Sequence, residues 1–393
     1  MALPRTRLDG RRRALGLTQG QLAEAVGVSL YTVQRWLSGR HAPQPHHLPR
    51  LAQVLKVSLQ ELDGFLGDES ESLPPAELRR DHVLRHPRSV DFAAARDFRD
   101  DLEELSARYD TLPSASLLPE AQRQLTRLEA TAAQAQRSRL RRELHTLHAD
   151  ATLLMGALVW DASQRSDLHS AGMYYKDAMG TARTLQDRAL EGYALLRLAY
   201  LELYGARQPL RGFELAKQAA RRAGPVSHAL AGVAHLHAAE AQAMLGEERA
   251  CTRALIAADY HLERASDADV HADLLSPSPV GRLTGACYLA LGQHHRAQAI
   301  LSGTAAQLVG RPKSRSIAQG NLAMAYVGAG DVDGAVEALN SALGDLEKSR
   351  GGGGMTIAAT AVRHLRPWRT HTAVADVTDR MLALLAAPYP RSS

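Results

Sequence analysis

Hydrophobic residues near the start of the chain recur at the spacing expected for short amphipathic helices. In TQGQLAEAVG, residues 18–27, Leu22, Ala23 and Val26 fall on one helix face. Thr18 and Gln21 match a capping box, in which each side chain accepts a hydrogen bond from the other residue's backbone N–H. The segments LPRLAQVLKV and SLQELDGFL show the same pattern further on. Residues 1–67 are therefore predicted to form five short helices.

The segment SLYTVQRWLSGR, residues 29–40, predicts a helix whose two faces differ in character. Ser29 is a favoured residue for a helix start, and Gly39 is predicted to end the helix. Val33, Trp36 and Leu37 share the apolar face that should pack into the core. The opposite face is predicted to point outward and contains Ser29, Leu30, Tyr31, Gln34 and Arg35.

Beyond residue 67 the pattern predicts a linker and then a long helical region. GDESESLPP, residues 67–75, is acidic and serine-rich and ends in two prolines, which is typical of a linker, predicted over residues 68–88. From residue 89 to 393, helical segments follow one another without a convincing strand pattern. NLAMAYVGAGDVDGAVEALNSAL, residues 321–343, predicts two antiparallel helices joined at GAGD, and weaker copies recur upstream. The fold prediction is all-α, with a five-helix N-terminal domain and a TPR-like helical-repeat solenoid.

Charge divides the chain at the same place. Residues 1–67 contain nine basic and four acidic side chains, so they hold the whole net charge of +5, and the remainder is neutral. A small basic module on a large neutral body predicts a polyanionic partner for the module. The longest apolar run, ATLLMGALVW, is too short to cross a bilayer, and the start MALPRTRLDG lacks a signal-peptide core. With only two cysteines, a cytoplasmic and non-membrane protein is expected.

Residues 18–39 resemble the helix-turn-helix of the Cro/phage-repressor (xenobiotic-response, XRE) family. They carry Thr-Gln-x-x-Leu-Ala-x-x-Val-Gly and then Val33, Trp36 and Gly39 at the family's spacing. The resemblance implies that one helix crosses the DNA backbone while the next enters the major groove. It implies that Arg35 reads guanine and Gln34 adenine, whereas arginines near the helices contact phosphates. The DNA-binding residues implied are Gln19, Ser29, Leu30, Tyr31, Gln34, Arg35, Arg40, Arg11, Arg12 and Arg13.

The whole layout resembles actinobacterial TPR-containing regulators and the peptide-pheromone receptors of Gram-positive bacteria. The segments RYDTLPSASLLPEAQ, RSIAQGNLAMAYVGAGDVDGA and HLRPW look like those of the first group. The resemblance implies a nucleoid-associated transcription regulator that binds operator DNA, and a homodimer is expected from paired half-sites. In TPR proteins the concave groove commonly binds peptides, so a peptide or small-molecule effector is expected there. The candidate groove residues, for which ordinary surface polarity is the alternative, are Glu202, His237, Glu240, Arg282, Asn321 and Met324.

Other motifs point away from metal or catalytic chemistry. The histidine clusters have no Cys, Asp or Glu at ligand spacing, so no metal site is expected. No Ser-His-Asp or paired-carboxylate pattern stands out, so we expect neither an enzyme nor a bound cofactor. RGGGGMT, residues 350–356, is interpreted as a flexible joint before a last helix pair. The alternative function is a TPR adaptor that binds a protein partner and uses the N-terminal module for docking.

Overall fold

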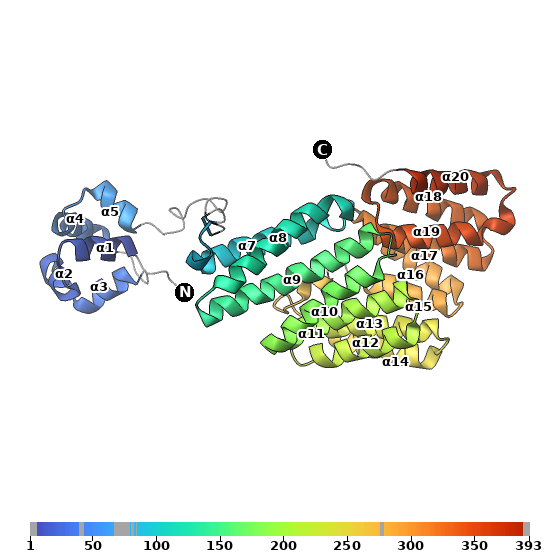
Figure 1. Ribbon diagram of the computed structural model, residues 1–393, viewed down its shortest axis with the longest axis horizontal. Helices are drawn as coiled ribbons and strands as arrows, with labels where there is room; N and C mark the ends of the chain where they lie inside the picture. The colour runs from blue at the N-terminus through green and yellow to red at the C-terminus, as the bar shows by residue number, and fades with distance from the viewer. Residues whose placement is uncertain are drawn as a thin grey trace. The chain divides into compact units, whose positions relative to one another are not determined.

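The computed structural model describes residues 6–38, 43–66, 79, 82–83, 85–275 and 279–387. The chain divides into two units, Met1–Asp81, called the N-terminal unit, and His82–Ser393, called the repeat region (Figure 1). The residues within these described segments form helices and no strand, which confirms the all-α prediction. None of the described helices is long and apolar enough to cross a membrane.

The described part of the N-terminal unit contains the five short α-helices that its hydrophobic pattern predicts, together with one 3-10 turn. The capping box at residue 18 is present, since the Thr18 N–H donates to Gln21 Oε1 at 2.8 Å and the Gln21 N–H to Thr18 Oγ1 at 3.1 Å. Gly27 ends the second helix with a φ of 82°, a backbone conformation that favours glycine. The elements are α1 (Thr6–Ala14), α2 (Gln19–Val26), α3 (Leu30–Leu37), η1 (Pro45–His47), α4 (Leu48–Leu55) and α5 (Leu59–Leu66).

One apolar core holds these five helices together. Val33 and Trp36 of α3 are buried, as predicted, against Leu22 of α2 and Leu51 and Leu55 of α4. Because its core-facing side is used inside the unit, α3 has only its other side available to an outside molecule.

The repeat region is a series of antiparallel helix pairs arranged in two layers. Helices with odd numbers from α7 to α19 each contact the next odd-numbered helix, and the even-numbered helices pack against them (Figure 1). The helices are α7 (Phe92–Arg108), α8 (Ser114–Gln134), α9 (Ser138–Ala162), α10 (Leu168–Leu185), α11 (Arg188–Tyr200), α12 (Pro209–Ala223), α13 (His228–Met244), α14 (Glu248–Leu262), α15 (Val280–Ala290), α16 (His294–Gln307), α17 (Pro312–Ala329), α18 (Val332–Ser349), α19 (Gly352–His364) and α20 (Thr372–Ala386). Short turns of helix are η3 (Pro87–Ser89), η5 (Ala272–Leu275), η6 (Arg366–Trp368) and the π-helical η4 (Leu201–Gly205).

Tight turns join the best-marked helix pairs where the sequence pattern places them. Gly246, Gly292 and Gly330 have φ values of 78°, 71° and 80° and lie between the two helices of successive pairs. Gly330 belongs to GAGD, so this segment is the helix-pair turn that the pattern predicts. Val83, in the segment predicted as a linker, is buried in the core around α7 and α8.

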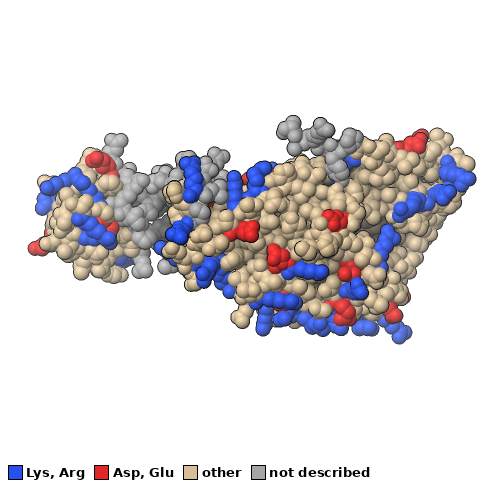
Figure 2. Space-filling model, viewed as in Figure 1, with Lys and Arg blue, Asp and Glu red and all other residues tan. Residues whose placement is uncertain are grey.

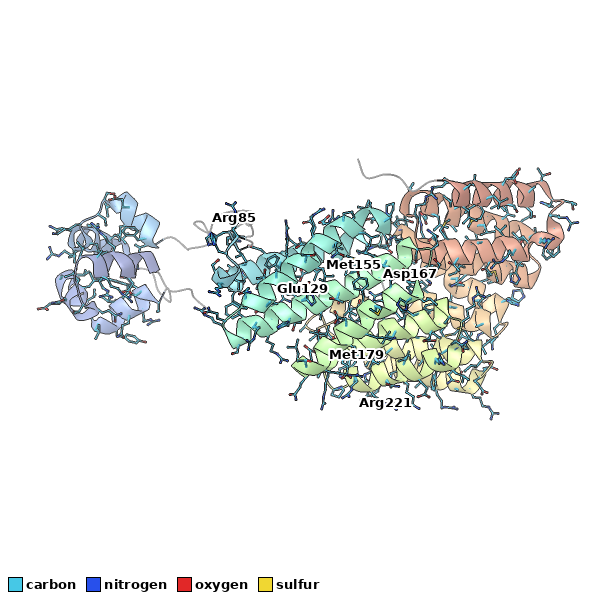
Figure 3. The ribbon with its side chains drawn as sticks, viewed as in Figure 1. Arg85, Glu129, Met155, Asp167, Met179 and Arg221 are labelled. Atoms are coloured by element: carbon cyan, nitrogen blue, oxygen red, sulfur yellow. The ribbon has the colours of Figure 1, made fainter. Side chains whose placement is uncertain are left out.

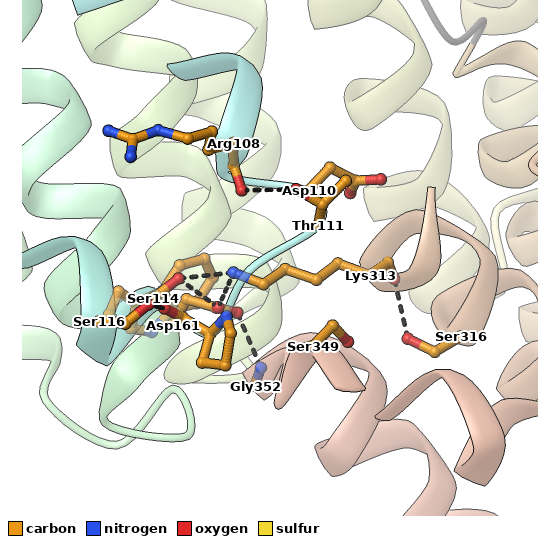
Figure 4. A network of polar contacts seen from close by, with 12 residues as sticks. Arg108, Asp110, Thr111, Ser114, Ser116, Asp161, Lys313, Ser316, Ser349 and Gly352 are labelled. Atoms are coloured by element: carbon orange, nitrogen blue, oxygen red, sulfur yellow. Dashed lines mark hydrogen bonds and ion pairs between the residues drawn. The ribbon is translucent and has the colours of Figure 1, made fainter. Parts of the chain in front are cut away.

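Two parts of the repeat region about 200 residues apart meet in a buried polar contact (Figure 4). The Lys313 ammonium lies 2.9 Å from Asp161 Oδ2 and donates to Ser114 Oγ at 2.7 Å. The Gly352 N–H donates to the other carboxylate oxygen, Asp161 Oδ1, at 2.8 Å. The side chains of Lys313 and Asp161 are each only 5% exposed. Ser114, Asp161, Lys313 and Gly352 together are called the closing junction, because they join α8 and α9 to α17 and α19.

The glycine run before the last helix pair is a packing surface, so its interpretation as a flexible joint is wrong. Gly351 to Gly354 are buried, and three of them form the first turn of α19. A Cβ atom on Gly352 would lie 2.6 Å from the backbone oxygen of Asp161, and one on Gly353 would collide with the guanidinium of Arg165. Glycine is therefore needed for the close approach of α19 to the end of α9.

Candidate functional site

The outward side of α3 is the first candidate surface. Ser29 begins the helix by accepting a hydrogen bond from the Thr32 N–H at 3.1 Å. Leu30 and Tyr31 follow it and are 47% and 65% exposed, although both are large hydrophobic residues. Gln34 is also exposed, one turn further along the helix. The structure thus brings these four predicted residues together on one accessible face.

Arg35 extends this face but is only partly exposed. Its guanidinium carbon lies 5.5 Å from the centre of the Tyr31 ring, which is the arrangement of a cation–π contact. The contact restrains both side chains on the surface of α3, so less conformational entropy would be lost when they bind a partner.

The arginines of α1 have three different environments. Arg11 donates from Nε to the Leu55 oxygen at 3.0 Å, so it binds the C-terminal end of α4. Arg12 is buried, pairs with Asp9 and also donates to the Leu17 oxygen. Arg13 is 73% exposed and pairs with the same Asp9 carboxylate at 2.6 Å.

These environments bear on the predicted phosphate contacts. The guanidinium groups of Arg11 and Arg12 are used inside the N-terminal unit, so Arg13 is the best placed of the three to reach an outside anion. Gln19 is half-buried at the start of α2. Arg40 lies outside the described residues.

A cavity of about 250 Å³ on the odd-numbered helix layer is the second candidate site. Its walls come from the turn after α9, from η4, and from α13, α15, α17 and α19, so both sides of the closing junction contribute. The lining residues are Arg165, Tyr204, Glu240, Met244, Arg282, Ala286, Leu289, Ala290, Ile317, Asn321 and Ile357.

A three-residue polar cluster forms one wall of this cavity. The Tyr204 hydroxyl donates to Glu240 Oε2 and lies 2.7 Å from Nδ1 of His237. Because that hydroxyl proton is given to Glu240, His237 must donate from Nδ1, which assigns its neutral tautomer. Nε2 of His237 is then a buried acceptor without a hydrogen-bond partner in the described part of the chain.

Burial sets the protonation of this cluster. It raises the pKa of Tyr204 well above its ordinary value, and the neighbouring Glu240 charge adds to the effect. Burial also lowers the pKa of His237 well below 6.5, helped by the positive charge of Arg282, so the imidazole is neutral at pH 7. The pKa of Glu240 is raised by burial, although the Tyr204 hydrogen bond and Arg282 oppose the rise. The cluster therefore contributes at most one negative charge to the cavity.

Two arginines supply the positive charge. Arg165 lies over the Trp160 ring at 4.6 Å and the Tyr204 ring at 5.6 Å, and its Nε is buried without a hydrogen-bond partner among the residues described. Arg282 is partly exposed to the cavity, and within the described segments it makes no hydrogen bond or ion pair. The cavity thus holds two cationic groups against one carboxyl.

The six groove residues predicted from the repeat pattern divide into three groups. Glu240, Arg282 and Asn321 line the cavity. His237 lies behind the lining and contacts it through Tyr204. Glu202 is half-buried outside the lining, with a buried Oε2 that has no partner among the described residues, and Met324 packs against the core of the C-terminal helices.

Sequence reasoning missed Arg165 and Tyr204. Arg165 lies in a turn, whereas the groove predicted from the sequence was lined only by the first helix of each pair. Tyr193, Tyr200 and Tyr204 were a usable signal, since they share helical spacing in a chain with only 5% aromatic residues. The Tyr193 hydroxyl accepts a hydrogen bond from Arg197 at 2.6 Å, which continues this aromatic surface along α11.

Many other charged side chains lie away from the cavity. Figure 2 shows basic side chains along the edge that α12 and α14 form, interspersed with acidic ones. Arg221 is one of them and points outward from α12 (Figure 3). Among the described residues, no group of three or more His, Cys, Asp or Glu side chains is arranged to hold a metal ion. Cys251 and Cys287 are buried free thiols.

Comparison with known proteins gives the N-terminal unit its assignment. Residues 10–62 match a family model described as helix-turn-helix, and this range includes α2, the turn at Gly27 and α3. Residues 10–62 form a helix-turn-helix domain. A 68-residue stretch of the chain is 35% identical to the cryptic phage CTXphi transcriptional repressor RstR of Vibrio cholerae serotype O1. That alignment covers 17% of this chain and 61% of the repressor's length.

A solved structure was also found to be similar over a longer stretch. It is the crystal structure of Bacillus thuringiensis PlcR in complex with the peptide PapR7 and DNA. The TM-score is 0.30 with 14% sequence identity, and the match covers 69% of this chain and 96% of that chain.

Proposed function

We propose that the protein is a sequence-specific, DNA-binding transcription regulator. The observation that carries the proposal is the outward face of α3, where Leu30, Tyr31 and Gln34 are exposed on a helix whose other side is packed. This helix belongs to a helix-turn-helix domain similar to a phage repressor. In such domains the second helix places its N-terminal residues against base edges in the major groove.

The contacts proposed for this face follow from its chemistry. Leu30 and Tyr31 suit the methyl group of thymine, and Gln34 can pair with N6 and N7 of adenine. Arg35 can reach guanine while it stays stacked on Tyr31. Ser29, Gln19, Arg13 and Arg40 are proposed to contact the backbone or its phosphates, which sets register without reading sequence.

The protein is further proposed to act as a homodimer whose repeat region senses an effector. One helix-turn-helix domain buries little surface on DNA, so a second half-site would add both affinity and specificity. The cavity supports effector sensing because Arg282 and Nε of Arg165 have no hydrogen-bond partner among the described residues. Light scattering on the purified protein would measure the oligomeric state, and a monomer at micromolar concentration would contradict the dimer.

Two exposed leucines of the N-terminal unit allow a matched test of DNA binding. Leu30 is 47% exposed on α3, and Leu59 is 55% exposed on α5. Binding to DNA from upstream of the protein's own gene would be measured by fluorescence anisotropy across a salt series. Leu30→Ala should weaken specific binding by about tenfold, because a base contact is worth roughly 1–3 kcal/mol, whereas Leu59→Ala should change nothing.

The same titration separates the regulator from the alternative of a repeat-protein adaptor. Gln34→Ala should relax specificity at one base pair without changing the salt slope, since it contacts no phosphate. Equal affinity for operator and unrelated DNA, or equal effects of Leu30→Ala and Leu59→Ala, would remove the proposal. A stoichiometric protein partner without a DNA footprint would then favour the adaptor.

A further inference from the structure

The cavity of the repeat region has a shape and a charge that indicate what it can hold. Its volume of about 250 Å³ lies below the roughly 300–1,000 Å³ typical of sites for drug-sized ligands. At roughly 30 Å³ per water molecule this is the volume of about eight waters, which suits a ligand of about ten non-hydrogen atoms because bonded atoms pack more closely than separate waters. A ligand that is fully enclosed in this volume is therefore smaller than a peptide of several residues.

The closing junction is the reason for the small size. Lys313 and Asp161 join α17 to α9 within the odd-numbered helix layer, and Gly352 brings α19 against the end of α9. The turn after α9 thereby lies close to α17 and α19, and all three contribute residues to the cavity wall. Residues from both sides of the closing junction therefore contribute walls to one small cavity.

The charges of the lining favour a single negative group on the ligand. Arg282 has no hydrogen bond or ion pair within the described part of the chain, and Nε of Arg165 is buried without a partner there. Glu240 is already bound by the Tyr204 hydroxyl, so it offers little to a cationic ligand. A free guanidinium binds a carboxylate through two parallel N–H···O bonds, which are charge-assisted.

The other walls favour an apolar body behind that negative group. Side chains of Met244, Leu289, Ile317 and Ile357 line the cavity from α13, α15, α17 and α19. An apolar ligand body would be desolvated against them, which is favourable in proportion to the buried area. A strongly polar ligand such as a sugar would leave its hydroxyl groups without partners on these walls.

The backbone that presents Arg165 has an uncommon conformation. Gln164 and Arg165 are successive non-glycine residues with φ values of 55° and 62°. Residues other than glycine rarely adopt this conformation, and such positions persist where the surrounding structure holds them. Gly352 and Gly353 of α19 pack directly on this turn, so the closing junction also fixes the position of Arg165.

From these observations we propose that the cavity binds a small monocarboxylate with an apolar aliphatic or aromatic body, with Arg282 and Arg165 receiving the carboxylate. The inference rests on the proposed effector sensing and gives the effector a chemical class. Because the ligand would touch helices on both sides of the closing junction, its binding would stabilise the closed arrangement of the repeat region.

Calorimetric titration of the full-length protein tests this, with hexanoate and phenylacetate as probes. Their neutral amides, hexanamide and phenylacetamide, match them in shape, and an apolar heptapeptide with a free carboxyl end tests the size limit. We expect each acid to bind one site per chain, with affinity at least tenfold higher than that of its amide, and we expect no binding of the heptapeptide.

Arginine variants locate the site. Arg282→Gln should reduce the affinity for both acids at least tenfold, and Arg282→Lys should recover part of it by restoring the charge. Arg221→Gln, on the outer surface of α12, should have no effect. Circular dichroism melts would verify that each variant is folded, which is expected because Arg282 has no hydrogen bond to lose among the described residues.

The results separate this inference from the proposed function. Equal binding of acids and amides, binding of the heptapeptide alone, or no binding of either acid at millimolar concentration would overturn the carboxylate site. None of these results would change operator binding by the ligand-free protein. If the DNA-binding proposal were contradicted, the calorimetric result would still be valid, because that titration contains no DNA.

Discussion

The helix-turn-helix unit and the repeat region place their polar side chains differently. In the N-terminal unit, Arg11 and Arg12 bind backbone oxygens, and the side chains proposed to read bases all lie on one helix, α3. In the repeat region, Lys313 and Asp161 are buried against each other and come from helices far apart in the chain. The outward face of α3 forms as soon as this one helix packs on its neighbours. The cavity, in contrast, forms only when segments far apart in the sequence come together.

The largest expected effect is a loss of stability on breaking the closing junction, and it should be confined to the repeat region. Lys313→Ala leaves Asp161 buried without its cation, so the free energy of unfolding of the repeat region should fall by about 3–5 kcal/mol. Urea denaturation followed by circular dichroism measures this loss, and DNA binding by the N-terminal unit should persist. Lys348→Ala, at an exposed position of α18, is the control. A similar small loss for both variants would show that the junction does not hold the region together.

A smaller loss of stability is expected from adding a side-chain atom at Gly352. In Gly352→Ala the new Cβ would meet the Asp161 backbone oxygen, which cannot turn away, so we expect a loss of about 1–3 kcal/mol in the free energy of unfolding. Gly344→Ala should instead raise the free energy of unfolding by roughly 0.5–1 kcal/mol, because alanine is favoured over glycine inside a helix. The new Cβ there would meet only Arg380 Nη2, at 3.7 Å. Chemical denaturation of both variants compares them, and equal signs would argue against close packing at Gly352.

The smallest effect belongs to the N-terminal unit. Thr18→Ala removes the capping box of α2 and should lower the stability of this unit alone by about 1 kcal/mol. Amide hydrogen exchange would show faster exchange in α1 to α5 and unchanged exchange in the repeat region. Thr18→Ser keeps the hydroxyl and should exchange like the wild type. Faster exchange throughout the chain would mean that the two units are not energetically separate.

Local signals explain what could be predicted from the sequence. The capping box at Thr18, the buried side of α3 and the turn at Gly330 all depend on residues within a few positions of one another. The same holds for the repeated helix pairs, since each pair packs mainly on its neighbours. The helical fold and the exposure of Tyr31 therefore followed from periodicity alone.

The cavity could be predicted only in part, because its walls are brought together by contacts between residues far apart in the sequence. Glu240, Arg282 and Asn321 were found from the repeat pattern, since they lie on the first helices of their pairs. The pairing of Asp161 with Lys313 has no local signal, and without it the glycines at the start of α19 look like a loose segment. Met324 lies one helical turn after Asn321 but packs against the core of the C-terminal helices and is not part of the cavity lining.

The π-helical turn at Leu201–Gly205 makes the position of one cavity side chain, Tyr204, sensitive to the number of residues in the turn. A π-turn contains one residue more than an α-helical turn, and Tyr204, which contacts His237 and Glu240, lies within it. Removing a single residue here would restore the α-helical register and rotate Tyr204 by about 100° around the helix axis. Insertions and deletions of one codon, as well as substitutions, could therefore change which side chains line the cavity while the rest of the repeat stays in place.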